Sequence, residues 1–253
     1  MRKLIGIAIA ALAFCASPAL ADTTSTPPGA PCSKNNGNPC NGNNGNLGAQ
    51  GNVGHEKVKI DKKPPPITIG MPPVSGRGAY VSQIGDGNEA SVVQTAPNAY
   101  ALIEQEGDHN DADVAQTGTG TDYLEVAQTG DTNFARVQQS GSGQNVAYVA
   151  QNGNGNWIWS RQDALGAIHN GARLTQNGNN NDMALDQEGS DNLAILTQQG
   201  DENGMTATQL GVGNRLTWTQ EGTGLSDLQV TQTGGNQTGG QLLITQTNTG
   251  SGH

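Results

Sequence analysis

The chain has 253 residues, of which 33% are hydrophobic and 4% are aromatic, and it contains 37 glycines. This composition has too few apolar side chains for an ordinary compact core and approaches that of disordered chains. The formal net charge of −10 makes nucleic acid an unexpected partner, because the nucleic-acid backbone is itself negative.

Residues 1–21 have the features of a secretion signal peptide. Arg2 and Lys3 precede a short apolar run, and residues 19–21 supply the small side chains that a signal peptidase needs. We therefore expect an exported mature chain that begins at Asp22. Its net charge is −12, because the two basic residues are removed with the signal.

Residues 22–76 form an Asn/Gly/Pro-rich segment and linker that we expect to be flexible and disordered. Cys32 and Cys40 lie in this segment. In an oxidising compartment they could close a small disulfide loop, which we favour over a metal site because no histidine pair lies nearby.

Residues 77–246 repeat one short pattern, in which a glutamine recurs mostly every 11 or 12 residues. A glycine stands two residues after most of these glutamines, where a tight turn with positive φ would need it. The repeat glutamines are Gln83, Gln94, Gln105, Gln116, Gln128, Gln139, Gln151, Gln162, Gln176, Gln187, Gln198, Gln209, Gln220, Gln232 and Gln246.

Three further positions of each unit are fixed relative to its glutamine. The positions two and four residues before it are apolar in all units but one, where Ser160 stands. An asparagine stands six residues before most of the glutamines: Asn88, Asn110, Asn133, Asn145, Asn156, Asn170, Asn181, Asn192, Asn203 and Asn214. These offsets have period two and share one face of a strand. Each unit is therefore a half-buried strand followed by a turn. A helix is not expected, because Gly and Asn recur in every window.

Stacking supplies the burial that one such strand lacks. If alternate units lie on opposite walls, one coil takes about 22 residues and each wall is a parallel sheet with strands about 4.8 Å apart. The predicted fold class is all-β, a cross-β-like β-solenoid of stacked strand-turn-strand repeats. A short polar tail follows at residues 247–253. Inward Asn and Gln amides would form a structural ladder, each bonding to its copies above and below and setting the register.

The units resemble the curlin repeat, the unit of bacterial curli fibres. Residues 83–94 and 187–198 both match Gln-x-Gly-x-x-Asn-x-Ala-x-x-x-Gln, and the resemblance covers residues 77–246. It implies a secreted structural protein that self-assembles into extracellular functional amyloid, in cell-surface fimbriae that serve adhesion and biofilm matrix. The partners it implies are further copies of the chain, a curli-type nucleator, an outer-membrane secretion pore, and host or abiotic surfaces.

Some units depart from the family pattern. Asn leads nearly all units, whereas the family alternates Ser-led and Asn-led strands, and residues 95–97 and 163–165 replace the usual x-Gly turn. These departures leave open whether the chain is a major fibre subunit or the minor nucleator subunit. A monomeric solenoid adhesin with capped ends is a further alternative.

Catalysis, cofactors and metal binding are not expected. The acids are scattered singly over turns, whereas an enzyme needs one constellation in a concave site. Residues 108–113 could bind calcium or another metal, but the 11-residue period differs from that of a calcium β-roll. We therefore favour a solvated turn and the ladder residue Asn110. Trp157 and Trp159 should point outward, where they could stack on sugars, join fibres sideways or simply make a locally apolar strand face, while Trp218 should point inward.

The ends and the turns bear on assembly. Neither terminus carries a recognisable capping helix, so both ends of the solenoid should offer open strand edges. Acids in the turns should slow premature assembly as gatekeepers. These are Asp86, Asp108, Asp131, Asp191 and Asp201.

Overall fold

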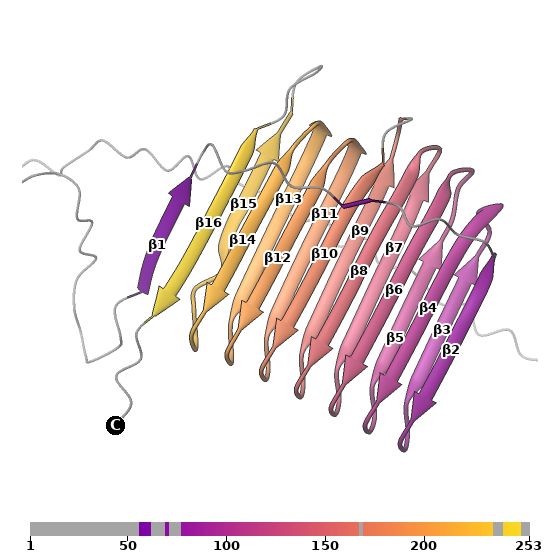
Figure 1. The fold of residues 1–253 in the computed structure, drawn as a ribbon, viewed down its shortest axis with the longest axis horizontal. Coiled ribbons are helices and arrows are strands. Elements are labelled where there is room, and N and C mark those ends of the chain that lie inside the picture. The colour runs from indigo at the N-terminus through magenta and orange to yellow at the C-terminus, as the bar shows by residue number, and fades with distance from the viewer. Residues whose placement is uncertain (1–55, 62–68, 71–76, 167–168, 235–239, 249–253) are drawn as a thin grey trace, which may run out of the picture. The chain divides into compact units, whose positions relative to one another are not determined.

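A computed structural model of the chain describes residues 56–61, 69–70, 77–166, 169–234 and 240–248 (Figure 1). The expected signal peptide, the Cys32–Cys40 pair, most of the expected flexible segment and the end of the polar tail lie outside the described residues. Those assignments stay predictions. Within the described residues every regular element is a strand.

The strands form two sheets (Figure 1). The nine-stranded sheet, called sheet A, contains in spatial order β1 (Glu56–Asp61), β16 (Gln241–Asn248), β14 (Arg215–Glu221), β12 (Leu193–Gln199), β10 (Asn170–Asn177), β8 (Gln144–Asn152), β6 (Thr121–Thr129), β4 (Asn98–Glu106) and β2 (Gly78–Ile84). The seven-stranded sheet, called sheet B, contains β15 (Leu228–Thr233), β13 (Gly204–Val212), β11 (Asp182–Ser190), β9 (Trp157–Ala164), β7 (Phe134–Gly141), β5 (Asp111–Gln116) and β3 (Glu89–Gln94).

Alternate units stack on opposite sheets, and from β2 to β16 all pairing is parallel. The register places repeat glutamine beside repeat glutamine, as for Gln128 beside Gln151 in sheet A and Gln139 beside Gln162 in sheet B. The predicted two-walled β-solenoid is confirmed. Turns with insertions, such as the one between β9 and β10, leave the register of their neighbours unchanged.

The core lies between the two sheets and follows the period of two. In β6, Leu124 and Val126 are at most 1% exposed, whereas Glu125 between them faces outward and is half-buried. Trp218 is fully buried, as predicted, and its indole Nε1 donates to Gln246 Oε1 at 2.6 Å. The alternation arises because successive side chains of a strand point to opposite faces.

Stacked turns require glycine where successive coils approach each other. Gly130 has φ of 101°, and a Cβ on it would lie 2.3 Å from the carbonyl oxygen of Gly153 in the next coil. The backbone N of Gly153 in turn donates to Thr129 O at 3.0 Å. A side chain at such a position would force the coils apart and break this bond.

Ser160 is the polar exception on the inner face, and it gives a stability prediction. It lies between Val137 and Leu185 of the neighbouring strands, is fully buried, and its hydroxyl has no partner. A buried unsatisfied hydroxyl costs about 1–3 kcal/mol, so Ser160→Ala should stabilise the monomer by about 1 kcal/mol. The urea midpoint of freshly purified protein measures this. Ser91→Ala, on the exposed face of β3, should leave the midpoint unchanged. Destabilisation by Ser160→Ala would contradict the assignment.

Part of the outer face of sheet A is buried, although this face was predicted to meet water. Ile69 is 3% exposed and packs against Tyr123, Val146 and Leu193. It fills the space left by Gly171, where a Cβ would lie 3.0 Å from Ile69 Cβ and 2.7 Å from Leu193 Cδ2. Gly171 is not among the residues with positive φ, so its missing side chain matters for space and not for backbone conformation.

The edge strand β1 corrects two expectations, that residues 22–76 are flexible throughout and that both ends of the solenoid are open. It pairs antiparallel with β16, with Val58 opposite Gln246 and Ile60 opposite Ile244. The segment alternates charged and apolar residues, so it can place two apolar side chains on the inner face of the last coil. The lysines between them lie on the outer face, opposite Thr245 and Thr247.

Candidate functional site

The repeat glutamines of each sheet form a continuous hydrogen-bonded column. From Gln83 in sheet A and Gln94 in sheet B, each glutamine donates from Nε2 to Oε1 of the next glutamine in its sheet, at 2.7–3.0 Å. Every donation runs from the N-terminal coil toward the C-terminal coil. Both columns therefore have a direction: the acceptor oxygens face the N-terminal end of the solenoid, and the donor nitrogens face the C-terminal end.

The glutamine columns also tie the two sheets together, which the sequence pattern did not reveal. Gln139 Nε2 in sheet B donates to Tyr123 O in sheet A at 3.0 Å, and Gln128 Nε2 in sheet A donates to Asp111 O in sheet B at 3.1 Å. Both amides thus use one hydrogen along the column and the other across the core. This satisfies the buried amide nitrogen, which would otherwise cost about 1–3 kcal/mol.

Burial of the glutamines changes only at the ends. Those from Gln105 to Gln220 are at most 2% exposed. At the N-terminal end, Gln83 is exposed and Gln94 is half-buried, and among the described residues no hydrogen bond reaches the Oε1 of either. At the other end, Gln232 is 8% exposed and Gln246 is fully buried.

The repeat asparagines form two further columns, at the turns that lead into each sheet. The column leading into sheet B contains Asn88, Asn110, Asn133, Asn156, Asn181 and Asn203. From Asn110 to Asn181, the backbone N and the side-chain Nδ2 both donate to Oδ1 of the preceding asparagine, at 2.9–3.1 Å. The same Nδ2 atoms donate at 2.7 Å to turn-glycine carbonyls of the next coil. Each of these side chains therefore bridges three coils.

The column leading into sheet A contains Asn145, Asn170, Asn192 and Asn214, and begins with an acid, Asp122. Asp122 is 1% exposed, and its Oδ1 accepts from Asn145 Nδ2 at 2.9 Å while its Oδ2 has no partner. Burial raises the pKa of Asp122 to about 6, and the bond from Asn145 lowers it by a smaller amount. This position is the one charge-bearing site within the buried amide columns of the described residues.

The turn acids have a structural role besides their charge. Oδ1 of Asp108 accepts from the backbone N of Asp86 at 2.8 Å, and Oδ1 of Asp131 accepts from that of Asp108 at 2.9 Å. Neutral Asn154 and Asn179 continue the same column with the same bond. An uncharged amide can therefore replace the carboxylate without loss of the hydrogen bond.

Asp191 differs from the other expected gatekeepers. Its Oδ1 lies 2.7 Å from Arg215 Nη2, and its φ is 56°. Both side chains are less than one third exposed. An ion pair neutralises its charge locally, so Asp191 contributes little repulsion between approaching copies.

The two ends of the solenoid present different surfaces. Tyr80, Val81, Ile84 and Val93 belong to the N-terminal coil and are 48–64% exposed. They make up half of the large apolar side chains that are exposed among the described residues. At the C-terminal end, β1 covers the edge of β16, while β15 is the last strand of sheet B. Exposed large apolar side chains are thus more numerous at the N-terminal end, while Val58 and Ile60 of β1 are exposed at the C-terminal end.

Aromatic side chains form rows on both outer faces. On sheet A, Tyr100 and Tyr123 stack with ring centroids 5.1 Å apart. On sheet B, Phe134 and Trp157 stack at 6.2 Å, and Trp157 is 37% exposed. Trp159 lies on the same outer face, as predicted. Stacking between successive coils adds modest stability to the solenoid beyond burial.

The acids of residues 108–113 are divided among different partners. Asp108 bonds to the neighbouring turn, Asn110 belongs to the asparagine column, and Asp113 pairs with Arg136 at 2.9 Å. Within the described ranges, no three His, Cys, Asp or Glu side chains lie close enough to hold a metal ion. Residues 108–110 lie in a turn, as expected, whereas Asp111 and Asp113 belong to strand β5.

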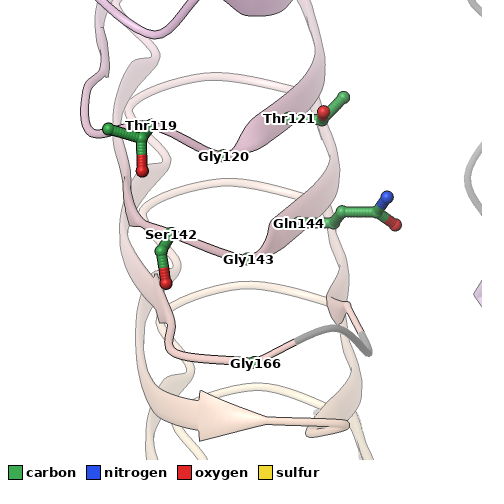
Figure 2. A pocket seen from close by; sticks show the side chains of 7 residues that line it. All are labelled: Thr119, Gly120, Thr121, Ser142, Gly143, Gln144 and Gly166. Carbon is green, nitrogen blue, oxygen red and sulfur yellow. The ribbon is translucent and has the colours of Figure 1, made fainter.

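A shallow hollow lies on the rim of the stacked turns (Figure 2). It is lined by Thr119, Gly120, Thr121, Ser142, Gly143, Gln144 and Gly166. Figure 2 shows the three glycines stacked between two sets of polar side chains. None of the lining side chains is ionisable, so they offer neither a general acid or base nor a charged metal ligand.

Together, the amide columns and the paired parallel sheets define a β-solenoid repeat protein whose coils are held in register by buried polar side chains. A family model, described as curlin associated repeat, matches residues 169–200, which include β10, β11 and β12. This match confirms the resemblance to the curlin repeat in that part of the chain. No curated protein and no solved structure matches the chain. In the described part of the chain, no helix is long and apolar enough to cross a membrane.

Proposed function

We propose that this chain is a secreted structural protein that assembles end to end into extracellular, curli-type amyloid fibres for cell adhesion and biofilm matrix. A curlin repeat within a β-solenoid fits a fibre subunit. The signal-like residues 1–21 and the resemblance to curlins support export, growth on a nucleator and passage through an outer-membrane pore. The proposed role is structural and requires no catalysis.

One observation supports the proposal most directly: successive coils contact each other in the same way along the solenoid. Parallel pairing and glutamine on glutamine recur from β2 to β16. On one edge, turn glycine also lies on turn glycine in every coil from Gly85 to Gly222. A second copy could therefore repeat at its own junction the contacts that already exist within one chain. Because the glutamine columns are polar, they favour head-to-tail addition, which extends without closing.

A monomeric solenoid adhesin is the second candidate, and β1 is the observation that favours it. A strand that covers the edge of β16 is a device that soluble sheet proteins use against edge-to-edge association. The open and apolar N-terminal coil argues for assembly instead, because nothing described covers it.

Incubation of the purified mature chain at micromolar concentration tests the proposed function. We expect a lag, then fibres that bind Congo red and give a reflection at about 4.7–4.8 Å along the fibre axis. Fragments of these fibres should abolish the lag when added as seeds. A protein that stays monomeric for days, with or without seeds, would favour the adhesin.

Removing charge from the turn column should accelerate assembly. Replacement of Asp86, Asp108, Asp131 and Asp201 by Asn keeps the bonding oxygen that Asn154 and Asn179 already supply. Because it removes repulsion between copies, we expect the thioflavin lag to shorten severalfold at low salt and less at high salt.

The control is the double variant Asp191→Asn/Arg215→Gln, which removes a turn acid together with the cation that it pairs with and so leaves the net charge unchanged. It should leave the lag nearly unchanged. A fourfold variant with an unchanged or longer lag would show that the turn acids do not act as gatekeepers.

A further inference from the structure

The C-terminal edge of sheet A is occupied by the chain itself. Strand β1 lies antiparallel on β16, whereas all other strand pairs of the described residues are parallel. We propose that this edge is the docking surface for β2 of a second copy, and that β1 is an internal cap which β2 must displace. This inference rests on the proposed function, because it concerns how the copies join.

The cap buries the inward residues of β16, since Ile244 is 2% and Gln246 0% exposed, but it is poorly packed itself. Val58 and Ile60 face inward beside Gln246 and Ile244, yet they remain 44% and 55% exposed. The cap contains no amide, so neither residue can extend the glutamine column. Lys57 also stays exposed, and lysines on an edge strand discourage a further strand from pairing with it. Strand β1 therefore ends the sheet without continuing its pattern.

Strand β2 of another copy fits the same edge better. In the parallel register that all coils share, its Gln83 would lie on Gln246 and its Val81 on Ile244. Val81 is 48% exposed, so it can bury more apolar surface against a second copy. No described group donates to Gln83 Oε1, so this oxygen can accept a hydrogen bond from a second copy. Strand β3 would at the same time come to lie on β15 and extend sheet B.

A second contact holds the cap segment to the solenoid. Ile69 fills the space above Gly171 on the outer face of sheet A, and its carbonyl oxygen lies 2.5 Å from His169 Nε2. This anchor on β10 limits how far β1 can move away from the solenoid. A tethered strand competes at millimolar effective concentration, whereas a second copy arrives at micromolar concentration. The monomer therefore stays capped, and assembly begins with a lag.

A reversible covalent lock tests the exchange. Lys59 and Thr245 lie directly opposite each other on the outer face, at a separation that suits a disulfide between antiparallel strands. The variant Lys59→Cys/Thr245→Cys is made in a Cys32→Ser/Cys40→Ser background, so that no other thiol of the mature chain interferes. Circular dichroism checks that the oxidised protein is folded, and the same protein after reduction is its own control.

We expect the oxidised protein to elongate wild-type seeds at least tenfold more slowly than the reduced protein. It should also block wild-type growth at substoichiometric amounts. Its free β2 can join a fibre end, but its locked β1 stays on β16 and prevents β2 of the next copy from pairing there. Elongation at the same rate in both states would overturn the inference and leave the proposed function intact. Failure of the wild-type chain itself to form fibres would refute the proposed function, and this inference with it.

A second pair of variants tests the cap without a crosslink. Val58→Ser/Ile60→Ser weakens the inward face of β1 and should shorten the lag at least threefold. Lys57→Arg/Lys59→Arg changes the outward face of the same strand without changing its charge and should leave the lag within twofold. Equal effects of the two variants, or a longer lag for the first, would contradict a capping role.

Discussion

Gln139→Leu is expected to destabilise the monomeric solenoid by about 4 kcal/mol, although leucine is the more hydrophobic residue. Gln139 accepts from Gln116 Nε2 at 2.8 Å, and donates to Gln162 Oε1 at 2.9 Å and to Tyr123 O at 3.0 Å. The leucine would leave these three partners buried without their bonds, at about 1–3 kcal/mol each before relaxation. The urea midpoint of the monomer, followed by circular dichroism, measures the loss.

The neighbouring residue supplies the matched control. Gln138 is the same residue type on the same strand, but it points outward and is exposed. Gln138→Leu should change the free energy of unfolding by less than about 0.5 kcal/mol. If both variants cost the same, the glutamine column would be incidental to stability, and the argument for assembly through it would fail.

The repeated part of the fold could be predicted because the residue pattern of each unit indicates a strand and shows which of its side chains point inward. Asn133, Ala135, Val137 and Gln139 alternate with outward residues, and the structure buries all four. The spacing of the glutamines then assigns alternate units to opposite sheets. Local patterning, turn chemistry and long-range pairing agree in every coil, which is the condition under which a sequence specifies one fold.

The pairing of β1 with β16 could not be predicted, because β1 has none of the sequence features of the repeat units. Residues 56–61 contain no Asn, Gln or Gly, and the partner strand lies at the other end of the chain. Ile69 and Gly171 likewise meet only in three dimensions. In the sequence Gly171 resembles a turn glycine, although the structure uses it to make space. A single copy of a contact leaves no periodic signal.

The sequence predicts which residues form the candidate site, but not all of the hydrogen bonds that their side chains make. The sequence indicates that glutamines lie inside, and it does not indicate that each of them also bonds across the core to the opposite sheet. The bond from Gln139 Nε2 to Tyr123 O depends on how far apart the two sheets lie. Sheet separation is set by the apolar side chains packed between them, and no spacing along the chain reports it. The polarity of the columns depends on the same geometry.

Asp122→Asn should stabilise the monomer by about 3 kcal/mol at pH 7 and hardly at all at pH 4. The buried carboxyl has a pKa of about 6, against 3.8 in an unfolded chain, so between these values the folded state holds a proton that the unfolded state has released. Wild-type stability must therefore fall as pH rises through this range, and a pKa difference of about two units corresponds to about 3 kcal/mol. Asparagine carries no charge at either pH.

Urea midpoints of both proteins between pH 4 and pH 7.5 test this dependence. The wild-type midpoint should fall relative to that of Asp122→Asn, and the difference should level off above about pH 7. Asp86→Asn removes the same charge from an exposed turn and should follow the wild-type curve. Parallel curves for wild type and Asp122→Asn would show that the carboxyl is hydrated and that the column begins only at Asn145. Under the predicted behaviour, mildly acidic surroundings stabilise the coil that contains Asp122, near the open end at which copies would join.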